Sequence, residues 1–400
     1  MSEFRRMRWL TLCLSAAMLL GGCPRMMGRA TISLKDKNVT KIQAGAITPT
    51  ATACPGQPVM LKVYATTADN KTFETWEPLP DGSINKNDKL DFGEFAYAAS
   101  SGTVDPETGL FTPPADPLTN FDQPYTIAVS LIYNSSIASA ISLQPEYACI
   151  KLADWRAMPG ATGQAGFSGY GGSDGSYGGT GSNGGSGGDG SPGQQGDRGF
   201  DGNAGPAVDV KIAYLKSQCC GDLIIVKVSP CGAPDQAVTY VTTPDVQSPL
   251  VVDASGGAGG DGGSGGMGGS GGSGGSGISG GNGGNGANGG NGGDGASGGS
   301  GGYVNVIVPQ EHPEIGQFIA VINEGGPAGR GGYGGSGGYG GGGGGSTVQN
   351  GASGGSGASG YSGYDGRDGS PGAAGPPAQV TTVPLAQLFG QEMAGGLPVF

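Results

Sequence analysis

The sequence is poor in the residues that most enzyme chemistry requires. Only 13% of its 400 residues are charged, 7% are aromatic, and His312 is the single histidine. His312 lies between Glu311 and Pro313, a setting typical of a turn, and no base or metal-ligand set can be assembled around it. The sequence therefore predicts no catalytic residue, no metal and no cofactor, and we interpret the protein as non-enzymatic.

Positive charge is also scarce. The chain has 20 Lys and Arg residues against 32 Asp and Glu residues, which gives a formal net charge of -12. Because nucleic-acid binding depends on basic side chains that neutralise phosphates, we expect no nucleic-acid partner. Glycine, in contrast, is abundant, with 89 residues. Glycine has no side chain to bury, so any apolar core must come from the segments between the glycine tracts.

The amino terminus has the pattern of an export signal. Residues 1–22 begin with basic residues and continue in an apolar run that ends at Leu20, too short for the ~20 residues of a membrane span. The run is followed by Gly21-Gly22-Cys23, which resembles the lipobox of bacterial lipoproteins. The resemblance implies that 1–22 is a signal peptide, that Cys23 is acylated, and that 23–29 is a lipidated tether. The membrane is then a partner through these acyl chains.

The residue after Cys23 bears on location. Some Gram-negative lipoproteins carry aspartate there as an inner-membrane retention signal, whereas this chain has Pro24. The resemblance therefore implies a lipid-anchored protein of the cell envelope, on the outer membrane and facing the periplasm or the exterior. An ordinary signal peptide that contains a cysteine is the alternative.

Export to an oxidising compartment favours disulfides. Cys54 and Cys149 bracket the first globular segment, and we expect them to pair. Cys219, Cys220 and Cys231 lie close together in the sequence. Because adjacent cysteines rarely bond each other, we expect Cys231 to pair with Cys219 or Cys220. A zinc site is the alternative, but there is no CxxC and no second type of ligand nearby.

Residues 30–153 have an ordinary composition and are predicted to form a β-sandwich. Several short apolar runs alternate with Gly, Pro, Asn and Asp clusters, as in sandwich domains. The segment 100–114, Ser-Ser-Gly-Thr-Val-Asp-Pro-Glu-Thr-Gly-Leu-Phe-Thr-Pro-Pro, resembles a motif of bacterial immunoglobulin-like domains, which implies a spacer without catalytic activity. The acidic loop 81–94 spaces oxygen ligands loosely like a calcium loop. Lys86 and Phe92 replace its glycine and its bidentate acid, which favours a solvated turn.

Three glycine tracts follow, over residues 160–205, 256–302 and 325–375. Glycine occupies every third position throughout the first two tracts and in the second half of the third. A flexible linker needs glycine but no period, whereas a period of three indicates a helix with three residues per turn. The middle tract sharpens to Gly-Gly-X, in which X is mostly Ser, Asn or Asp.

Two helical structures have this period, the collagen triple helix and the polyglycine-II helix, and a disordered chain is the third alternative. Collagen relies on proline at about 15–20% or more, and the middle tract contains none. Gly-Gly-X leaves bare backbone on two of three helix faces, which suits single polyglycine-II helices with close neighbours. A collagen-like trimeric stalk and a disordered chain remain open, the latter because ordering glycine costs the most backbone entropy.

Each tract is interrupted near its centre and is predicted to turn back as a hairpin. The interruptions are Ser182-Asn183, Ile278-Ser279 and Ser346–Asn350. The intervening segments are predicted to be a β segment over 206–255, a β-hairpin over 303–324, and a C-terminal strand and tail over 376–400. All three hairpins could then leave one side of a small β-domain. This arrangement resembles glycine-rich antifreeze proteins of springtails and receptor-binding tips of some phage tail fibres. The Gly-Gly-X stretch also resembles repeats of mycobacterial glycine-rich surface proteins.

The predicted fold class is mainly β: an immunoglobulin-like β-sandwich, then a small β-domain that carries three glycine hairpins packed as a polyglycine-II bundle. The predicted function is that of a lipid-anchored cell-surface protein with a structural or adhesive role, whose surface glycan or protein ligand is unknown. The alternative is a binding module for a repetitive ligand, polysaccharide or ice, through the Ser, Asn and Asp face of the rods. Tyrosines of the tracts could stack on sugars or simply decorate the surface: Tyr170, Tyr177, Tyr333, Tyr339, Tyr361 and Tyr364.

Overall fold

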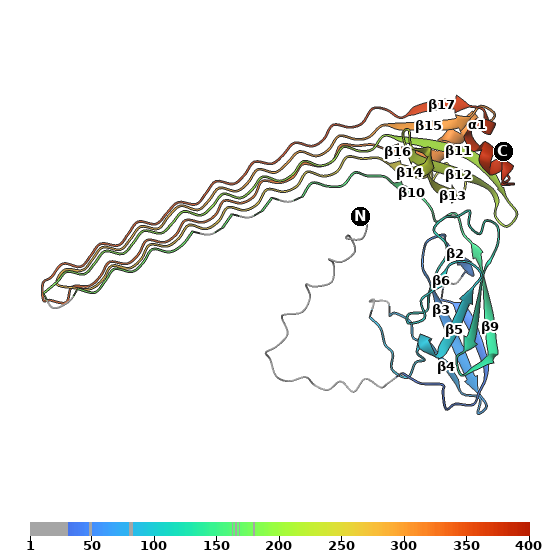
Figure 1. Ribbon diagram of the computed structural model, residues 1–400, viewed down its shortest axis with the longest axis horizontal. Helices are drawn as coiled ribbons and strands as arrows, with labels where there is room; N and C mark the ends of the chain where they lie inside the picture. Colours follow the sequence, from blue (N-terminus) through green and yellow to red (C-terminus); the bar gives the residue numbers. More distant parts are fainter. Residues whose placement is uncertain are drawn as a thin grey trace, which may run out of the picture.

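The structure is a computed structural model that describes residues 31–47, 50–79, 83–161, 163–164, 166–167, 169–178 and 181–400. The prediction of a mainly β chain is confirmed. Two β-rich domains lie next to each other, and a long bundle of extended chain projects from the second of them (Figure 1). The predicted signal peptide, Cys23 and the tether 23–29 lie outside the described residues.

The first domain consists of two sheets that are mostly antiparallel. One sheet has the order β1-β3-β7-β6 with β4 also paired to β3, and the other has the order β2-β9-β8-β5. Its strands are β1 (Val39–Ala46), β2 (Thr52–Ala53), β3 (Val59–Thr67), β4 (Thr72–Glu74), β5 (Phe95–Ala99), β6 (Thr103–Val104), β7 (Leu110–Thr112), β8 (Tyr125–Leu131) and β9 (Asn134–Pro145), with a short helix η1 (Phe92–Glu94) before β5.

The core of the first domain follows from alternation within these strands. In β3, Leu61, Val63 and Ala65 are fully buried while the residues between them are more exposed. In β8, Ile127 and Val129 are buried in the same way. Side chains of a strand point alternately to its two faces, so each sheet contributes one apolar face and the two faces enclose one core.

The second domain has one parallel sheet and one mixed sheet. The parallel sheet has the order β10-β14-β16, and the mixed sheet has the order β13-β12-β11-β15-β17. The strands are β10 (Leu152–Asp154), β11 (Val208–Ser217), β12 (Gly221–Pro230), β13 (Val238–Thr242), β14 (Leu250–Asp253), β15 (Val304–Pro309), β16 (Ile319–Ile322) and β17 (Gln379–Val383), with short helices η2 (Pro234–Gln236) and η3 (Pro313–Phe318).

The β-hairpin predicted over 303–324 is wrong. β15 and β16 belong to different sheets, and η3 joins them across the domain. β15 pairs in parallel with β11, and β16 pairs in parallel with β14. The physical reason is that the chain returns from one glycine tract in one layer of the molecule and must leave for the next tract in the other layer. A core of aliphatic side chains, including Val210, Val252 and Val306, lies between the two sheets.

The glycine tracts form six extended arms that are hydrogen-bonded to one another. We call the outgoing arms 1a (156–178), 2a (254–277) and 3a (324–345), and the returning arms 1b (184–206), 2b (280–302) and 3b (351–376). Arms 1a, 2a and 3a are joined in parallel by bonds such as Gly160 N–H to Ala258 O and Gly259 N–H to Pro327 O, and the returning arms are joined likewise. The two layers of three arms face each other through antiparallel bonds, such as Gly284 N–H to Gly272 O.

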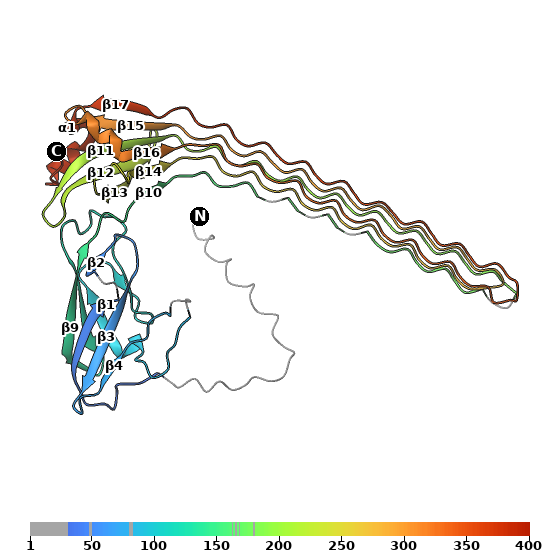
Figure 2. The ribbon, with the colours of Figure 1, turned by 180° about the vertical axis from the view of Figure 1, so that it is seen from behind.

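Each layer of arms continues one set of parallel strands. β10, β14 and β16 lead directly into the three outgoing arms, and the three returning arms lead into β11, β15 and β17. Figure 2 shows the strands running into the bundle from behind without a break in direction. The bundle is therefore a direct extension of the β-domain, and the two layers of arms correspond to its two sheets.

A second core joins the two domains. It lies on the face of the mixed sheet that is turned away from the core between the two sheets. There Leu215 and Leu223 pack with α1 (Leu385–Ala394), and Tyr147 of the first domain is buried in the same cluster. The segment predicted as a C-terminal strand and tail contains the strand β17, and the helix α1 forms part of the tail. The first domain rests on this cluster, beside the strands and away from the bundle (Figure 1).

Candidate binding surface

The interior of the bundle is built almost entirely of glycine, with Ala287 and Ala296 at two inward positions of arm 2b. An added Cβ at Gly262 would lie 2.0 Å from the carbonyl oxygen of Gly293, and one at Gly263 would lie 1.9 Å from that of Gln164. Ser264, the third residue of this triplet, is exposed. Backbones at this separation leave no room for a large side chain, so larger residues of the central arms such as Ser264 and Asn282 are exposed, while the small Ala296 is buried.

The number of neighbours explains the glycine content of each arm. Arms 2a and 2b each bond to four other arms, and they have glycine at nearly two of every three positions. Arm 3b lies at an edge, bonds to two arms only, and apart from Gly355 has glycine at only one of three positions. A Cβ added at its Gly360 would lie 2.0 Å from the carbonyl oxygen of Ala287, while Tyr361 and Ser362, the two residues that follow, are exposed. Glycine occurs where the backbone is surrounded.

A row of asparagines runs along the outer side of arm 2b. Asn282, Asn285, Asn288 and Asn291 occur at every third position, and each Oδ1 accepts the backbone N–H of a residue in arm 3b at 2.8–2.9 Å. Asp294 continues the row by accepting the N–H of Arg367 at 2.8 Å. These side chains satisfy N–H groups that the edge arm would otherwise present to water, and they fix the register between the two arms.

Aspartates make the same kind of contact elsewhere in the bundle. Asp261 accepts the N–H of Arg330 at 2.7 Å, and Asp365 accepts the N–H of Gly334 at 2.7 Å. Asp189 accepts the N–H of Asn285, so one asparagine takes part in bonds on both sides. Much of the polar face predicted to be free is thus already engaged through its oxygen atoms. The sequence signal for this role is the regular spacing of the asparagines, which by itself suggested only a face of Ser, Asn and Asp for a repetitive ligand.

The tyrosines of the tracts project from the bundle. Tyr361 and Tyr364 lie beside the asparagine row, where their own N–H groups donate to Asn288 and Asn291; their side chains are 81% and 82% exposed. Tyr333 and Tyr339 lie on arm 3a of the outgoing layer and are 76% and 79% exposed. Within the described residues no ring contact joins tyrosines of the tracts. Each ring is therefore open to a partner.

The three turns at the far end of the bundle bond to one another. The N–H of Ile278 donates to the carbonyl of Ser182 at 2.9 Å, and the Ser346 hydroxyl donates to the carbonyl of Ile278 at 2.8 Å. The turns thus lie at the interruptions identified in the sequence. These hydrogen bonds join the three turns to one another at the end of the bundle that is far from the β-domain.

The cysteines pair differently from part of the expectation. Cys54 and Cys149 form a disulfide with their Cα atoms 6.3 Å apart. Cys219 and Cys220 bond each other, and Cys231 is an exposed free thiol. The expected pairing of Cys231 with Cys219 or Cys220 is wrong because the ten residues of β12 separate them, a distance of about 30 Å at ~3.3 Å per residue.

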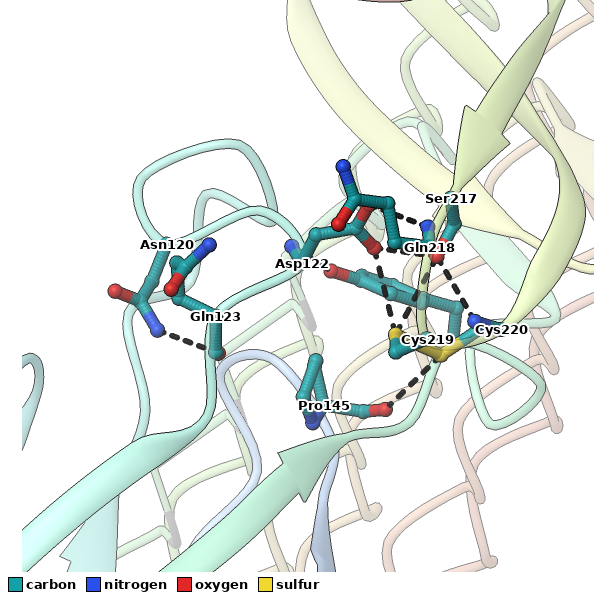
Figure 3. The surroundings of a disulfide bond; sticks show 9 residues. Asn120, Asp122, Gln123, Pro145, Ser217, Gln218, Cys219 and Cys220 are labelled. Atoms are coloured by element: carbon teal, nitrogen blue, oxygen red, sulfur yellow. Dashed lines mark hydrogen bonds between the residues drawn. A yellow bond between two sulfur atoms is a disulfide. The ribbon is translucent and has the colours of Figure 1, made fainter.

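The Cys219–Cys220 disulfide lies where the two domains meet (Figure 3). Asp122 of the first domain accepts the backbone N–H of Gln218 at 2.7 Å and the hydroxyl of Ser217. Cys220 donates its N–H to the Ser217 hydroxyl at 3.0 Å. Asp122 has φ of 60°, in the left-handed region, and sequence analysis did not identify it. No local motif marks it, since its partners lie about 95 residues away in the chain.

The residues considered for catalysis or metal binding lie apart from one another. His312 precedes η3, where its Nδ1 lies 3.1 Å from Glu314 and its ring packs edge-on against Tyr214. In the loop 81–94, Asp91 accepts the N–H of Gly93 at the start of η1, and Lys86 lies over the ring of Trp76. In the part of the chain that the structure describes, no three His, Cys, Asp or Glu residues are grouped as a metal site requires.

Comparison with protein-family models, with curated proteins and with solved structures gave no match. Across the described ranges, none of the helices has the length and apolarity that a membrane span demands.

Proposed function

We propose that this protein is a non-enzymatic, lipid-anchored component of the cell surface that projects a glycine-rich rod as a structural or adhesive element. The observation that carries the proposal is the bonding of the six arms. Every third described N–H of arms 1a, 3a and 3b, and two of every three in arms 1b, 2a and 2b, donates to a backbone carbonyl of a neighbouring arm or, near the β-domain, of the segment that leads into one. Such a rod is held mainly by its own peptide groups, which leaves outward side chains such as Tyr361 and Tyr364 available for contact.

The arms are best interpreted as polyglycine-II helices. Their described residues make no backbone–backbone hydrogen bonds within an arm, bonds to other arms recur every third residue, and this is the period of the extended left-handed helix. At ~3.1 Å per residue, an arm of about 24 residues spans roughly 75 Å. We also interpret the first domain as an immunoglobulin-like sandwich that acts as a spacer. Its two-sheet core and mostly antiparallel pairing support this assignment.

Anchoring is proposed from the lipobox-like sequence alone. Acylation of Cys23 would attach the chain to a membrane, because each buried methylene contributes ~0.8 kcal/mol. The described chain begins at 31, only eight residues after Cys23. A lipid at that position would hold the first domain at the membrane and leave the second domain and its rod to project.

The anchoring proposal is tested by expressing full-length wild type and Cys23→Ser in a Gram-negative host. We expect the wild type in the membrane fraction, labelled by a palmitate analogue, and the variant in the soluble envelope fraction without label. Cys231→Ser serves as the matched control and should behave as wild type. Protease treatment of intact cells then reports whether the rod faces the exterior. A Cys23→Ser protein that stays in the membrane and keeps its label would contradict the proposal.

A second candidate function is a binding module for a repetitive ligand. The asparagine row and the adjacent Tyr361 and Tyr364 favour it, because they present the same pair of groups at a constant interval. The two functions are compatible, since an adhesive rod needs such a surface. A glycan array probed with the full chain tests the polysaccharide version, and complete absence of binding would exclude the glycans on the array.

A further inference from the structure

The asparagine row has donors that the bundle itself does not use. Each Oδ1 of Asn282, Asn285, Asn288 and Asn291 accepts a backbone N–H from arm 3b, so the Nδ2 of the same carboxamide must point elsewhere. Within the described residues none of these Nδ2 groups makes a hydrogen bond, and all four side chains are exposed. The row therefore presents amide donors of fixed orientation, one for every three residues.

Two aromatic rings accompany these donors in register. The N–H of Tyr361 donates to Asn288 and that of Tyr364 to Asn291, at 2.8 and 2.9 Å. Each tyrosine is thereby held beside one asparagine, and the ring stands away from the arm with about four-fifths of its surface exposed. The two rings are three residues apart, so they recur at the same interval as the asparagines.

We propose that this strip, formed by Asn282, Asn285, Asn288, Asn291, Tyr361 and Tyr364, binds a polypeptide segment in the polyproline-II conformation. The inference rests on the proposed role of the rod as a projecting contact surface. A polyproline-II ligand has no internal hydrogen bonds, so its carbonyl oxygens are free to accept. Known modes of its recognition place aromatic rings along a groove that receives the proline side chains.

The period of the strip favours this ligand over a sugar polymer. Both the arm and a polyproline-II chain have three residues per turn and rise by ~3.1 Å per residue, so donors and acceptors both recur every ~9.3 Å. A contact made at one asparagine can then be repeated at the next, because the spacing of donors along the arm equals the spacing of acceptors along the ligand. The repeat of a polysaccharide is fixed by its glycosidic linkage and has no reason to match. None of the six residues of the strip is charged, which suits an uncharged proline-rich segment.

One substitution removes the side-chain donor of each asparagine and keeps its acceptor oxygen. Asn→Asp keeps an oxygen for the N–H of arm 3b and removes the Nδ2 donors, and Asp294 already makes this contact with Arg367. The triple variant N285D/N288D/N291D should therefore keep the bundle and lose the ligand. Y361A/Y364A should lose the ligand by removing the rings. Y333A/Y339A removes two rings of similar exposure from the outgoing layer and is the matched control.

The test is fluorescence anisotropy with the full chain and a labelled polyproline peptide of about twelve residues, which would extend ~37 Å. We expect saturable binding to wild type, a loss of affinity of at least about tenfold in both strip variants, and no more than about a twofold change in the control. Circular dichroism of each variant verifies that the bundle is retained. If the triple variant unfolds, single N288D and Y361A variants replace it.

Three outcomes would overturn the inference. Wild type does not bind the peptide, or the strip variants bind as well as wild type, or Y333A/Y339A loses as much affinity as Y361A/Y364A. Strip-dependent binding of labelled oligosaccharides in place of the peptide would assign the surface to glycans instead. Strip-dependent dimers in sedimentation would assign it to a second copy of the chain. None of these results affects the membrane and labelling test of Cys23, so failure here is distinguishable from failure of the proposed function.

Discussion

The backbone N–H of Gly160 donates to the carbonyl oxygen of Ala258 at 2.8 Å. This bond continues the pairing of β10 with β14, through the intermediate bonds of Trp155 to Asp253 and of Ala157 to Ser255. The sheet thus passes into the bundle without a break in its hydrogen bonding. Because the rod and the β-domain share one network, the rod is attached along three strands in each layer instead of through a flexible linker.

Two adjacent glycines of arm 3a test whether the interior is as close-packed as this network requires. A Cβ at Gly341 would lie 2.0 Å from the carbonyl oxygen of Gly272, whereas a Cβ at Gly342 would meet nothing within 4 Å. We expect Gly341→Ala to destabilise the bundle by about 1–3 kcal/mol. Gly342→Ala should be neutral or slightly stabilising, because it lowers the entropy of the unfolded chain. Thermal melts of the two variants compare them directly, and equal midpoints would contradict the packing.

The contact of Asp122 with the β11–β12 turn is predicted to fix the first domain against the second. Asp122→Ala leaves the N–H of Gln218 and the hydroxyl of Ser217 without their partner, at a cost of about 1–3 kcal/mol. We expect the two domains to unfold in separate denaturant transitions in this variant. The double variant C219S/C220S should shift in the same direction, because its turn is less constrained, and Cys231→Ser should not. A single unchanged transition in Asp122→Ala would count against an interdomain role.

Thiol labelling tests the disulfide pairing. Cys231 is exposed and free, while Cys54, Cys149, Cys219 and Cys220 are paired. Burial, with Asp209 nearby, raises the pKa of the Cys231 thiol, so its labelling should be slow at neutral pH and accelerate as the pH rises. Peptide mapping after maleimide treatment without reductant should find label on Cys231 and none on the other four. A disulfide peptide that contains Cys231 would show that the pairing is different.

An ion-pair cluster in the first domain gives a pH dependence. The Lys89 ammonium and then the Lys62 ammonium hydrogen-bond Glu74 and hold the pKa of its carboxyl below the usual value. A folded-state pKa below the unfolded one adds stability that is present above the unfolded pKa of ~4.3 and is lost as the pH falls through the folded pKa. Since the cluster is partly exposed, the loss should be about 1 kcal/mol or less.

Glu74→Gln checks this pH dependence. Denaturant melts between neutral pH and acid should show a shallower loss of stability in this variant than in wild type. Glu107→Gln, which changes an exposed carboxylate of the same domain, is the control and should follow the wild-type curve. If Glu74→Gln and wild type lose stability in parallel, the cluster does not contribute.

The sequence was informative where one local rule decides the structure. The β segment predicted over 206–255 contains β11 to β14, and the period of glycine located the arms and their turns at Ile278 and Ser346. It was misleading where the outcome depends on which layer a segment joins. Nothing local in 303–324 reveals that its two strands pair with strands on opposite sides of a core. Local features also gave no sign that the length of β12 keeps Cys231 away from Cys220.

The candidate surface was predictable only in part. The spacing of Asn282 to Asn291 was visible in the sequence, but its use required knowing that arm 3b lies beside arm 2b, 73 residues further along the chain. The period of three cannot specify which arms become neighbours. That choice follows from the order of strands in the two sheets, since β14 and β15 place the middle tract at the centre.

Residue-resolved amide hydrogen exchange of the glycine tracts tests the central claim most directly. In arm 2a, Gly262 and Gly263 both donate to backbone carbonyls, while the N–H of Ser264 has no backbone acceptor among the described residues. The account predicts strong protection at two of every three residues of the central arms and at one of three in arm 1a. Uniform exchange at the rate of an unstructured chain in all six arms would contradict it.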